Sequence, residues 1–488
     1  MSLCETLLSV RRLPQRLTCD SRRTITRFFW PGNEKRARRI FERVMALSDN
    51  EVSELLEATV EEFGLRHPDL PQTLTRYYQR AAGRARVSEE PSYQQQLLIG
   101  AYFTMEYAFE SAALFNPSMI PERNQNGVPE GATRFLMSLR AVGEGHVSSI
   151  VFRTGVIDLN GEIFIDPAIP YSQKLRMKEN REFDKDEFRE KLHEMGAYDE
   201  IAEPIFEQLP NPFTTGQLLA QIRAARPKGE RNTRFEEAVK NLKWLAQSNY
   251  EIRMDTGPGL SELVLFPISE GESQGMEDMR LVSFTDDDGA VRYYGTYTAF
   301  DGHRILPQML EFPEPGVAEV HTLHGKYAQN KGMALFPRKV NGAYALIGRI
   351  DGENLYFLQS DNIRFWNEAV QLQQPTYSWE FVQIGNCGSP IETDAGWLLL
   401  THGVGPMRRY CIGAMLLDID DPTKVIGQLD EPLLMPTDEE RSGYVPNVVY
   451  SCGGMVHDGL LVIPYGISDA ATGFATVPLE DVLSCLRT

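Results

Sequence analysis

The sequence predicts a mainly β protein that carries two helical segments. From about residue 250 to 480, short runs of β-branched and aromatic residues alternate with turn signals such as Asp286-Asp287-Asp288-Gly289 and Asn341-Gly342. This texture is typical of all-β barrels, sandwiches and propellers. Residues 36 to 115 and 172 to 245 instead have the apolar spacing and charge density of helices. No strict sequence repeat marks the strands, so periodicity alone leaves the three architectures open.

The first helical segment predicts packing helices without chemistry. Ser48 and Glu51 form a capping-box pattern, so we expect a helix to begin there. The run from Leu97 to Leu114 is apolar nearly all round and predicts a buried helix. After Ser48, apolar residues recur three and four positions apart and give one apolar face, at Val52, Leu55, Leu56, Val60 and Phe63.

The sequence pattern changes from helical to strand-like at Asn116-Pro117. Residues 134 to 168 predict two or three strands, with Asn160-Gly161 as a hairpin turn. Residues 172 to 245 return to charged, helical sequence, which we interpret as an insertion between strands. We therefore expect an N-terminal helical domain over residues 1–115 and a β domain over residues 116–488 that contains this insertion.

Charge and hydropathy exclude several classes of partner. The chain has 488 residues and a formal net charge of −19, from 68 acidic and 49 basic side chains. This balance disfavours nucleic acid and anionic membrane surfaces. It leaves room for a small anion such as phosphate, which needs only a local basic cluster. No stretch approaches the about 20 apolar residues of a membrane span. The scattered cysteines, which form no disulfide framework, instead lead us to expect a cytoplasmic protein.

Cysteine and motif usage exclude further classes of site. The six cysteines are far apart and form no CxxC pair, so we expect reduced thiols rather than a disulfide framework or a zinc site. P-loop, GxGxxG, HExxH and GxSxG motifs are absent. His321 and His324 are close in sequence, but we expect no metal site.

Several polar, glycine-rich segments with aromatic residues at apparent strand ends are candidates for chemistry. In Glu277-Asp278-Met279-Arg280, an ion pair could hold one carboxylate while the other faces a cleft. Glycoside cleavage needs such a carboxyl group, because the leaving oxygen must be protonated. A solvated ion pair is the plainer interpretation of this motif taken alone. The other segments are residues 330–339, 385–403, 444–452 and 464–469.

Taken together and in order, these segments resemble glycoside hydrolase family 130. That family consists of inverting β-mannoside phosphorylases and some β-mannosidases on a five-bladed β-propeller, so the resemblance implies that fold here. It covers residues 116–170 and 250–485, and both helical segments exceed the compact family core. The matching positions include Asn116-Pro117, Arg140, Glu277-Asp278-x-Arg280, Tyr297-Thr298-Ala299, Leu335-Phe336-Pro337, Gly388-Ser389-Pro390-Ile391, His402-Gly403, Pro446-Asn447-Val448-Val449 and Tyr465-Gly466-x-Ser468-Asp469.

The resemblance implies a role for each matching residue. Asp278 is the expected proton donor, acting through a hydroxyl of the bound mannosyl unit. The expected substrate is a small oligosaccharide, with inorganic phosphate as candidate co-substrate and no other cofactor or metal; a homo-oligomer is compatible with the sequence. The expected substrate-binding residues are Asn116, Arg140, Glu277, Tyr297 and Asp469, and the candidates for phosphate binding are Arg304, Lys331, Arg338, His402 and Arg408.

The sequence leaves two nucleophiles open, phosphate and water, and a third interpretation is that the protein is not an enzyme. Phosphorolysis to α-mannose 1-phosphate is favoured because most of the family performs it. Hydrolysis is the alternative, because Glu392 stands where many phosphorylases carry Lys and could serve as base, while Arg338 replaces a Glu of many relatives. The third reading is a non-catalytic sugar-binding propeller whose helices recruit a partner. The intact Glu277-Asp278-x-Arg280 and Ser468-Asp469 segments argue against it.

Overall fold

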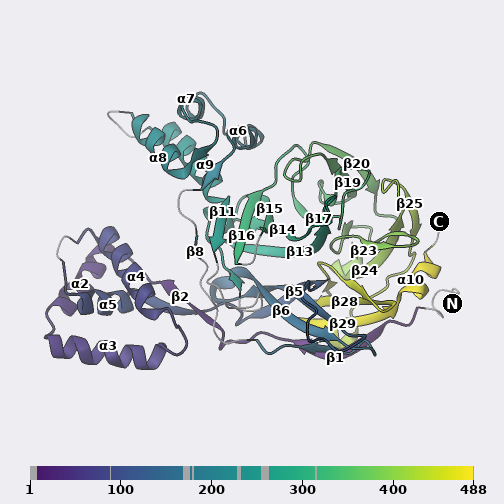
Figure 1. Cartoon of the computed structure of the whole chain (residues 1–488), viewed down its shortest axis with the longest axis horizontal. Coiled ribbons are helices and arrows are strands. Elements are labelled where there is room, and N and C mark those ends of the chain that lie inside the picture. Colours follow the sequence, from purple (N-terminus) through teal and green to yellow (C-terminus); the bar gives the residue numbers. More distant parts are fainter. Residues whose placement is uncertain are drawn as a thin grey trace.

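The computed structural model describes residues 8–87, 90–168, 176–177, 181–227, 232–253, 263–313 and 316–486, and is mainly β, as the sequence predicts (Figure 1). Most strands form antiparallel units in chain order. The first unit is β4 (Ala113–Pro121), β5 (Thr133–Val142), β6 (Ser148–Ile157) and β7 (Ile163–Ile165), with β12 (Val264–Leu265) also on β6. The second is β13 (Gly275–Thr285), β14 (Val291–Phe300), β15 (Ile305–Phe312) and β16 (Val317–Thr322), extended by β11 (Tyr250–Arg253) and β8 (Arg176–Met177). A parallel bridge between Ser148 of β6 and Gly275 of β13 joins these two units into one 11-stranded sheet.

Three further units follow along the chain. The third is β17 (Lys331–Leu335), β18 (Tyr344–Arg349), β19 (Leu355–Ser360) and β20 (Glu368–Gln373). The fourth places β21 (Gln383–Asn386) and β22 (Ile391–Thr393) on β23 (Gly396–Val404), followed by β24 (Tyr410–Leu417) and β25 (Val425–Gln428). The fifth places β26 (Val449–Tyr450) and β27 (Met455–His457) on β28 (Leu460–Ile467), followed by β29 (Ala471–Pro478) and β1 (Arg11–Leu17). Helix α10 (Leu479–Cys485) ends the described chain.

Hydrophobic clusters between neighbouring units hold the β part together. Period-2 alternation lets the strands of one unit present apolar side chains to the units on both sides. The buried pairs that represent these interfaces are Leu136 and Leu281 for units one and two, Val282 and Leu335 for two and three, Phe336 and Trp397 for three and four, Leu400 and Leu461 for four and five, and Phe474 and Phe135 for five and one.

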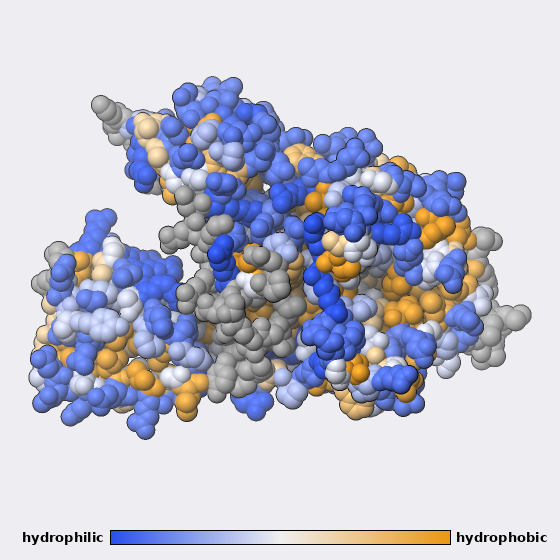
Figure 2. All heavy atoms as spheres, in the orientation of Figure 1, coloured by the Kyte–Doolittle hydropathy of each residue, from blue (hydrophilic) through white to orange (hydrophobic). Residues whose placement is uncertain are grey.

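The N-terminal helices form a separate unit at one end of the molecule (Figure 1). They are α2 (Glu34–Met45), α3 (Asp49–Phe63), α4 (Leu70–Ala85) and α5 (Tyr93–Tyr102), joined to the β part through the pair β2 (Thr24–Phe28) and β3 (Thr104–Ala108). The capping box of Ser48 and Glu51 opens α3, as predicted. Figure 2 shows hydrophobic side chains along the α3 side of this unit, where Leu55 and Val60 are each 41% exposed.

Two predictions about the N-terminal segment are wrong. The apolar run from Leu97 to Leu114 is not one helix: α5 ends at Tyr102, and the chain then enters β3 and β4, where strand pairing satisfies the backbone. The segment 1–115 is not a purely helical domain either, because β1 pairs with β29 as an outer strand of the fifth unit.

The second helical segment is inserted before β11. Its helices are α6 (Lys185–Glu194), α7 (Ala202–Glu207), α8 (Thr215–Ala224) and α9 (Thr233–Gln247), with a short pair formed by β9 (Glu182–Phe183) and β10 (Phe213–Thr214). Their apolar faces join the cluster between the first and second units, so the insertion packs on the β part. Parts of the predicted span 172–245, residues 172–175, 178–180 and 228–231, lie outside the described residues.

The cysteines differ from the prediction at one position. Cys19, Cys387, Cys411 and Cys452 are free thiols, but Cys485 is disulfide-bonded, so the expectation of reduced thiols throughout is wrong there. A search of the described helices finds none with the length and apolarity that a membrane crossing requires.

Candidate active site

Bulges interrupt the first strands of three successive units near their starts. The register shifts lie between Phe115 and Ser118 in β4, between Glu277 and Arg280 in β13, and between Lys331 and Ala334 in β17. At two of them Asn116 and Asp278 take φ of 49° and 55°, a left-handed conformation that Asn and Asp tolerate better than most residues. Bulges re-aim side chains and are common beside active sites, and here they turn Asn116 and Asp278 toward each other.

Asp278 is held by two neighbours on one of its oxygens. Asn116 donates from Nδ2 to Oδ1 of Asp278 at 2.8 Å, and a guanidinium nitrogen of Arg140 lies 3.6 Å from the same oxygen. Arg280 donates to the backbone carbonyl of Asp278 at 2.8 Å and to the hydroxyl of Tyr450 at 2.7 Å, which fixes the bulged backbone. Among the described residues both contacts of the carboxylate fall on Oδ1, which leaves Oδ2 for a substrate.

Glu277 is an ion-paired neighbour rather than a second free acid. Arg140 donates to its Oε1 at 2.8 Å and Lys331 donates to its Oε2 at 2.6 Å. Glu277 therefore orients two basic side chains, and Asp278 lies beside them.

The environments of Asp278 and Asp469 shift their pKa values in opposite directions. Burial raises the pKa of Asp278, but the charges of Arg140 and Arg280, with the Asn116 hydrogen bond, outweigh it, so the pKa lies below its usual value. Burial and then the Asp278 charge raise the pKa of Asp469 to about 6, against the lowering effect of Arg140 and Arg408. Pairs of carboxyl groups whose pKa values are shifted in opposite directions are typical of catalytic centres.

A basic cluster lies next to these carboxylates. Lys331 is opposite Arg349 in the β17–β18 ladder, so the two side chains share a face. Arg349 lies 3.4 Å from Nε2 of His402, whose Nδ1 donates to the carbonyl of Asn386 at 3.0 Å. Burial, then the charges of Arg349 and Arg280, lower the pKa of His402 well below its usual value, so this imidazole is neutral.

Several buried polar atoms of this cluster have no hydrogen-bond partner among the described residues. Native proteins pair most such atoms, and an unpaired buried group costs about 1–3 kcal/mol. Donors and acceptors of this kind pair with hydroxyls and oxyanion oxygens. The buried polar atoms are Oδ1 of Asn116 and of Asn386 and Nε of Arg140, of Arg280 and of Arg349. No group of three or more His, Cys, Asp or Glu side chains in the described chain is arranged to hold a metal ion.

Arg349 did not emerge from the sequence as a candidate. It comes last in β18, just before the turn at Asp351-Gly352, and only the ladder register brings it opposite Lys331. His402, which the sequence did single out, depends on the glycine opposite it. A Cβ on Gly385 would lie 2.3 Å from the imidazole ring, so the ring fits only beside glycine.

The structure does not bring Glu392 and Arg338 to this site. They pair with each other at 2.7 Å and line a cavity of about 320 Å³ together with Ser283 and Pro390. Arg338 bridges to Thr285 at the last residue of β13, and at about 3.3 Å per residue that end lies roughly 20 Å from Asp278. Glu392 therefore cannot act as a base on a sugar held at Asp278, since inverting carboxyl pairs are about 6.5–9.5 Å apart.

Three other residues predicted for the site lie away from Asp278 and the basic cluster, or at the edge of that cluster. Tyr297 is buried and donates to Glu272 at 2.7 Å, so it is a packing residue under the insertion. Arg304 lies on the exposed β14–β15 turn, 5.8 Å from the Trp244 ring. Arg408 is exposed beside Tyr410, and its charge reaches Asp469, which places it at the rim.

Comparisons with known proteins identify the family of this chain. The family model for glycoside hydrolase family 130, described as beta-1,4-mannooligosaccharide phosphorylase, matches residues 258–488. A 1,2-beta-oligomannan phosphorylase of Thermoanaerobacter sp. (strain X514) is 32% identical over 50% of this chain and 82% of its own. The chain belongs to glycoside hydrolase family 130. This confirms the family predicted from the sequence.

Further members of family 130 are similar over shorter or more divergent alignments. A beta-1,2-mannobiose phosphorylase from the same Thermoanaerobacter strain is 32% identical over 43% of this chain and 69% of its own. The solved structure of a beta-1,2-mannobiose phosphorylase from Listeria innocua is 19% identical, covers 77% of this chain and 92% of its own, and superposes with a TM-score of 0.46.

Replacing Asp469 by asparagine should stabilise this family 130 protein in a pH-dependent way. A folded pKa raised to about 6 means that the protonated carboxyl contributes stability that is complete below the unfolded pKa near 4 and lost as the pH rises through 6. Asparagine stays neutral and tolerates the local φ of 53°. The variant's gain in unfolding free energy should therefore grow by on the order of 1–3 kcal/mol between pH 4.5 and 7.5. Thermal unfolding midpoints across this range test it, and a difference independent of pH would contradict it.

Proposed function

We propose that this protein cleaves β-mannosidic bonds by phosphorolysis with inversion and releases α-mannose 1-phosphate. The observation that carries the proposal is that Asp278 and the basic pair Lys331 and Arg349 lie in one half-buried cluster. The carboxyl group meets the need for a proton at the leaving oxygen, and the basic pair meets the need for an oxyanion site. The curated relatives named above are β-mannoside phosphorylases by name.

The reaction is a single displacement. Asp278 delivers a proton toward the bridging oxygen, through a hydroxyl of the mannosyl unit, as that bond breaks. A phosphate oxygen attacks the anomeric carbon from the opposite face, and the leaving sugar departs as an alcohol. Phosphate is already an anion held by Lys331 and Arg349, so this step needs no protein base. Asn116, Arg140 and Asp469 bind the hydroxyls of the mannosyl unit.

Phosphate binding also prepares Asp278 to act as an acid. The positive charges of Arg140 and Arg280 lower the pKa of Asp278 and keep it ionised without phosphate. A phosphate dianion beside Lys331 and Arg349 adds negative charge, which favours the protonated form of a nearby carboxyl. Water alone brings no such charge, so the electrostatics favour phosphorolysis over hydrolysis. Glu392 lies too far from Asp278 to serve as the base that hydrolysis needs, which also favours phosphorolysis.

The fold that fits this site is a five-bladed β-propeller, with one blade for each antiparallel unit. The support is that the buried clusters link each unit to the next and the fifth back to the first. The pairing of β1 with β29 joins the two ends of the chain in one blade. The cluster then lies at one mouth of the central channel, with residues from every blade: Asn116, Asp278, Lys331, His402 and Tyr450.

Incubating the protein with β-1,2- and β-1,4-mannobiose, with and without inorganic phosphate, tests the proposal. We expect at least one disaccharide to be consumed, and its consumption to depend on phosphate and yield mannose 1-phosphate in equal amount to the released sugar. Release of free mannose at the same rate without phosphate would establish the β-mannosidase alternative instead. No consumption under either condition, with correct folding shown by circular dichroism, would contradict both.

A further inference from the structure

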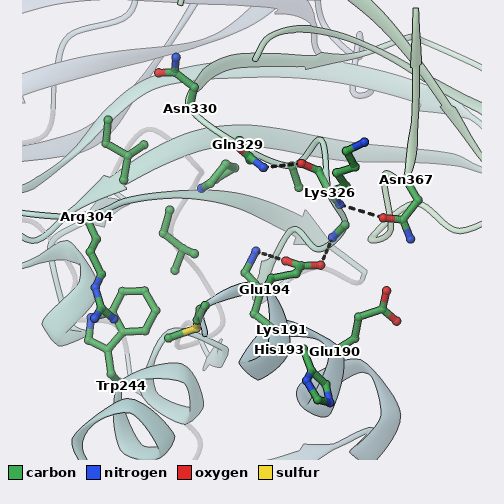
Figure 3. A pocket seen from close by; sticks show the side chains of 16 residues that line it. Glu190, Lys191, His193, Glu194, Trp244, Arg304, Lys326, Gln329, Asn330 and Asn367 are labelled. Atoms are coloured by element: carbon green, nitrogen blue, oxygen red, sulfur yellow. Dashed lines mark hydrogen bonds and ion pairs between the residues drawn. The ribbon is translucent and has the colours of Figure 1, made fainter. Parts of the chain in front are cut away.

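A large cavity lies between the helical insertion and the β part, and Asn330 in its lining directly precedes Lys331 of the candidate active site. It measures about 830 Å³, within the range of ligand-binding clefts. Figure 3 shows Arg304 and Trp244 on one side of it and Lys326 and Asn367 on the other. Helix α6 of the insertion contributes Glu194 to its wall. We refer to this cavity as the insertion groove.

The insertion groove lies at the same end of the strands as Asp278. Its lining includes Asn330, and the next residue, Lys331, donates to Glu277 in the catalytic cluster. It also includes Ile305, the first residue of β15, which is opposite Phe300, and Phe300 is opposite Gly275 at the start of β13. The groove and the site are therefore linked by adjacent residues at one end of the strands, and the groove lies in the direction in which an oligosaccharide held at Asp278 can extend.

Hydrogen bonds and an ion pair hold the insertion against the β part along the groove. Lys191 of α6 donates to the carbonyl of Leu323 at 2.9 Å and pairs with Glu194 at 2.7 Å, while Glu194 accepts from the backbone N–H of Gly325. Gly325 has φ of 104°, and a Cβ there would lie 2.5 Å from the Trp366 backbone, so only glycine fits. These bonds join the insertion to the loop that leads into β17, which gives the groove a formed shape.

The chemistry of the lining fits an uncharged polyhydroxyl ligand. Gln329, Asn330 and Asn367 supply amides, which donate to and accept from hydroxyl groups. Ile305 is 39% exposed and offers an apolar surface for the C–H face of a sugar. The charges are mixed, since Lys191 is neutralised by Glu194 and the groove carries both Arg304 and Glu190. A strongly anionic ligand would meet a purely basic lining instead.

We infer that the insertion groove binds the further mannosyl units of longer manno-oligosaccharides, so that the helical insertion selects for chain length. The inference rests on the proposed phosphorolysis at Asp278 and adds the place where the outer units of a longer substrate bind. Disaccharides fill only the catalytic cluster, whereas longer chains gain contacts in the groove and are cleaved with higher kcat/KM.

A groove-filling variant tests this inference with matched substrates. Gln329 is exposed and lines the groove, so Gln329→Trp should block it without touching Asp278. We expect kcat/KM for mannopentaose to fall about tenfold, the loss of one or two hydrogen bonds, while kcat/KM for mannobiose changes less than about twofold. Gln371→Trp, at an exposed position on the outer strand β20, is the control and should leave both values unchanged.

A second variant removes contacts without adding bulk, in case the tryptophan disturbs folding. Ile305→Ser should lower kcat/KM for mannopentaose relative to mannobiose in the same direction. Equal effects on both substrates, or none on mannopentaose, would overturn the role of the groove while leaving the phosphorylase intact. Absence of phosphate-dependent turnover for any chain length in the unmodified protein would instead overturn the proposed function, and this inference with it.

Discussion

Asp278→Asn should abolish phosphorolysis, with a loss in kcat of about 10²–10⁴, the range for removing a general acid. The amide cannot deliver a proton to the leaving oxygen. It keeps the shape of the side chain, can still accept the hydrogen bond from Asn116, and tolerates the φ of 55°. The fold should therefore survive, which circular dichroism and thermal unfolding can verify. The assay is phosphate-dependent consumption of the disaccharide that the unmodified protein cleaves.

A substrate series separates a proton donor from a structural role for Asp278. p-Nitrophenyl β-mannoside has a leaving group that needs no protonation, so the variant should retain much more of its activity on it than on a disaccharide. Glu392→Gln is the matched control, because this carboxyl group pairs with Arg338 at the other end of the strands. It should leave kcat within about twofold of the unmodified protein. Full disaccharide turnover by Asp278→Asn would remove Asp278 from its role.

Arg349→Met should raise the KM for phosphate by about 10–100-fold, because a charge-assisted hydrogen bond contributes about 1.5–3 kcal/mol. Methionine keeps an unbranched stem but has no charge, and the KM for the mannoside should change little because Arg349 faces Lys331 and His402. The measurement is initial rate against phosphate concentration at saturating mannoside.

Arg338→Met is the control for this second variant. It removes an arginine that lies beside the last residue of β13 and is paired with Glu392, so the KM for phosphate should stay unchanged. If Arg338→Met raised the KM for phosphate and Arg349→Met did not, the anion site would lie at the other end of the strands and the assignment of Lys331 and Arg349 would be wrong.

The residue pattern alone predicted a local motif, the family resemblance supplied distant partners such as Asn116 and Lys331, and neither pointed to Arg349. Glu277-Asp278-x-Arg280 is a local motif, and the structure keeps its members in contact through the bulge in β13. Arg349 and Lys331 are 18 positions apart, and only the β17–β18 pairing brings them together. A pattern of residue types along one strand carries no information about such partners.

Glu392 was predicted to lie in the active site, and the segment that contains it begins there, but the segment ends at the other end of the strands. The segment from Gln383 to Thr393 runs through β21 and β22, with Asn386 near His402 and Glu392 beside Arg338. Each residue advances the chain by about 3.3 Å, so a short polar segment can reach both ends of the neighbouring strands. Similarly, the apolar run after Leu97 suits a buried helix or a buried strand equally well, because burial on all sides removes the periodicity that distinguishes them.

Proton and phosphorus NMR of the sugar phosphate during the first minutes of turnover tests the central claim most directly. The coupling constants of the anomeric proton and the phosphorus resonance identify the anomer before any equilibration. Attack by phosphate opposite a bond protonated by Asp278 predicts α-mannose 1-phosphate as the first product. The β-anomer, or free mannose with no phosphorylated sugar, would contradict it.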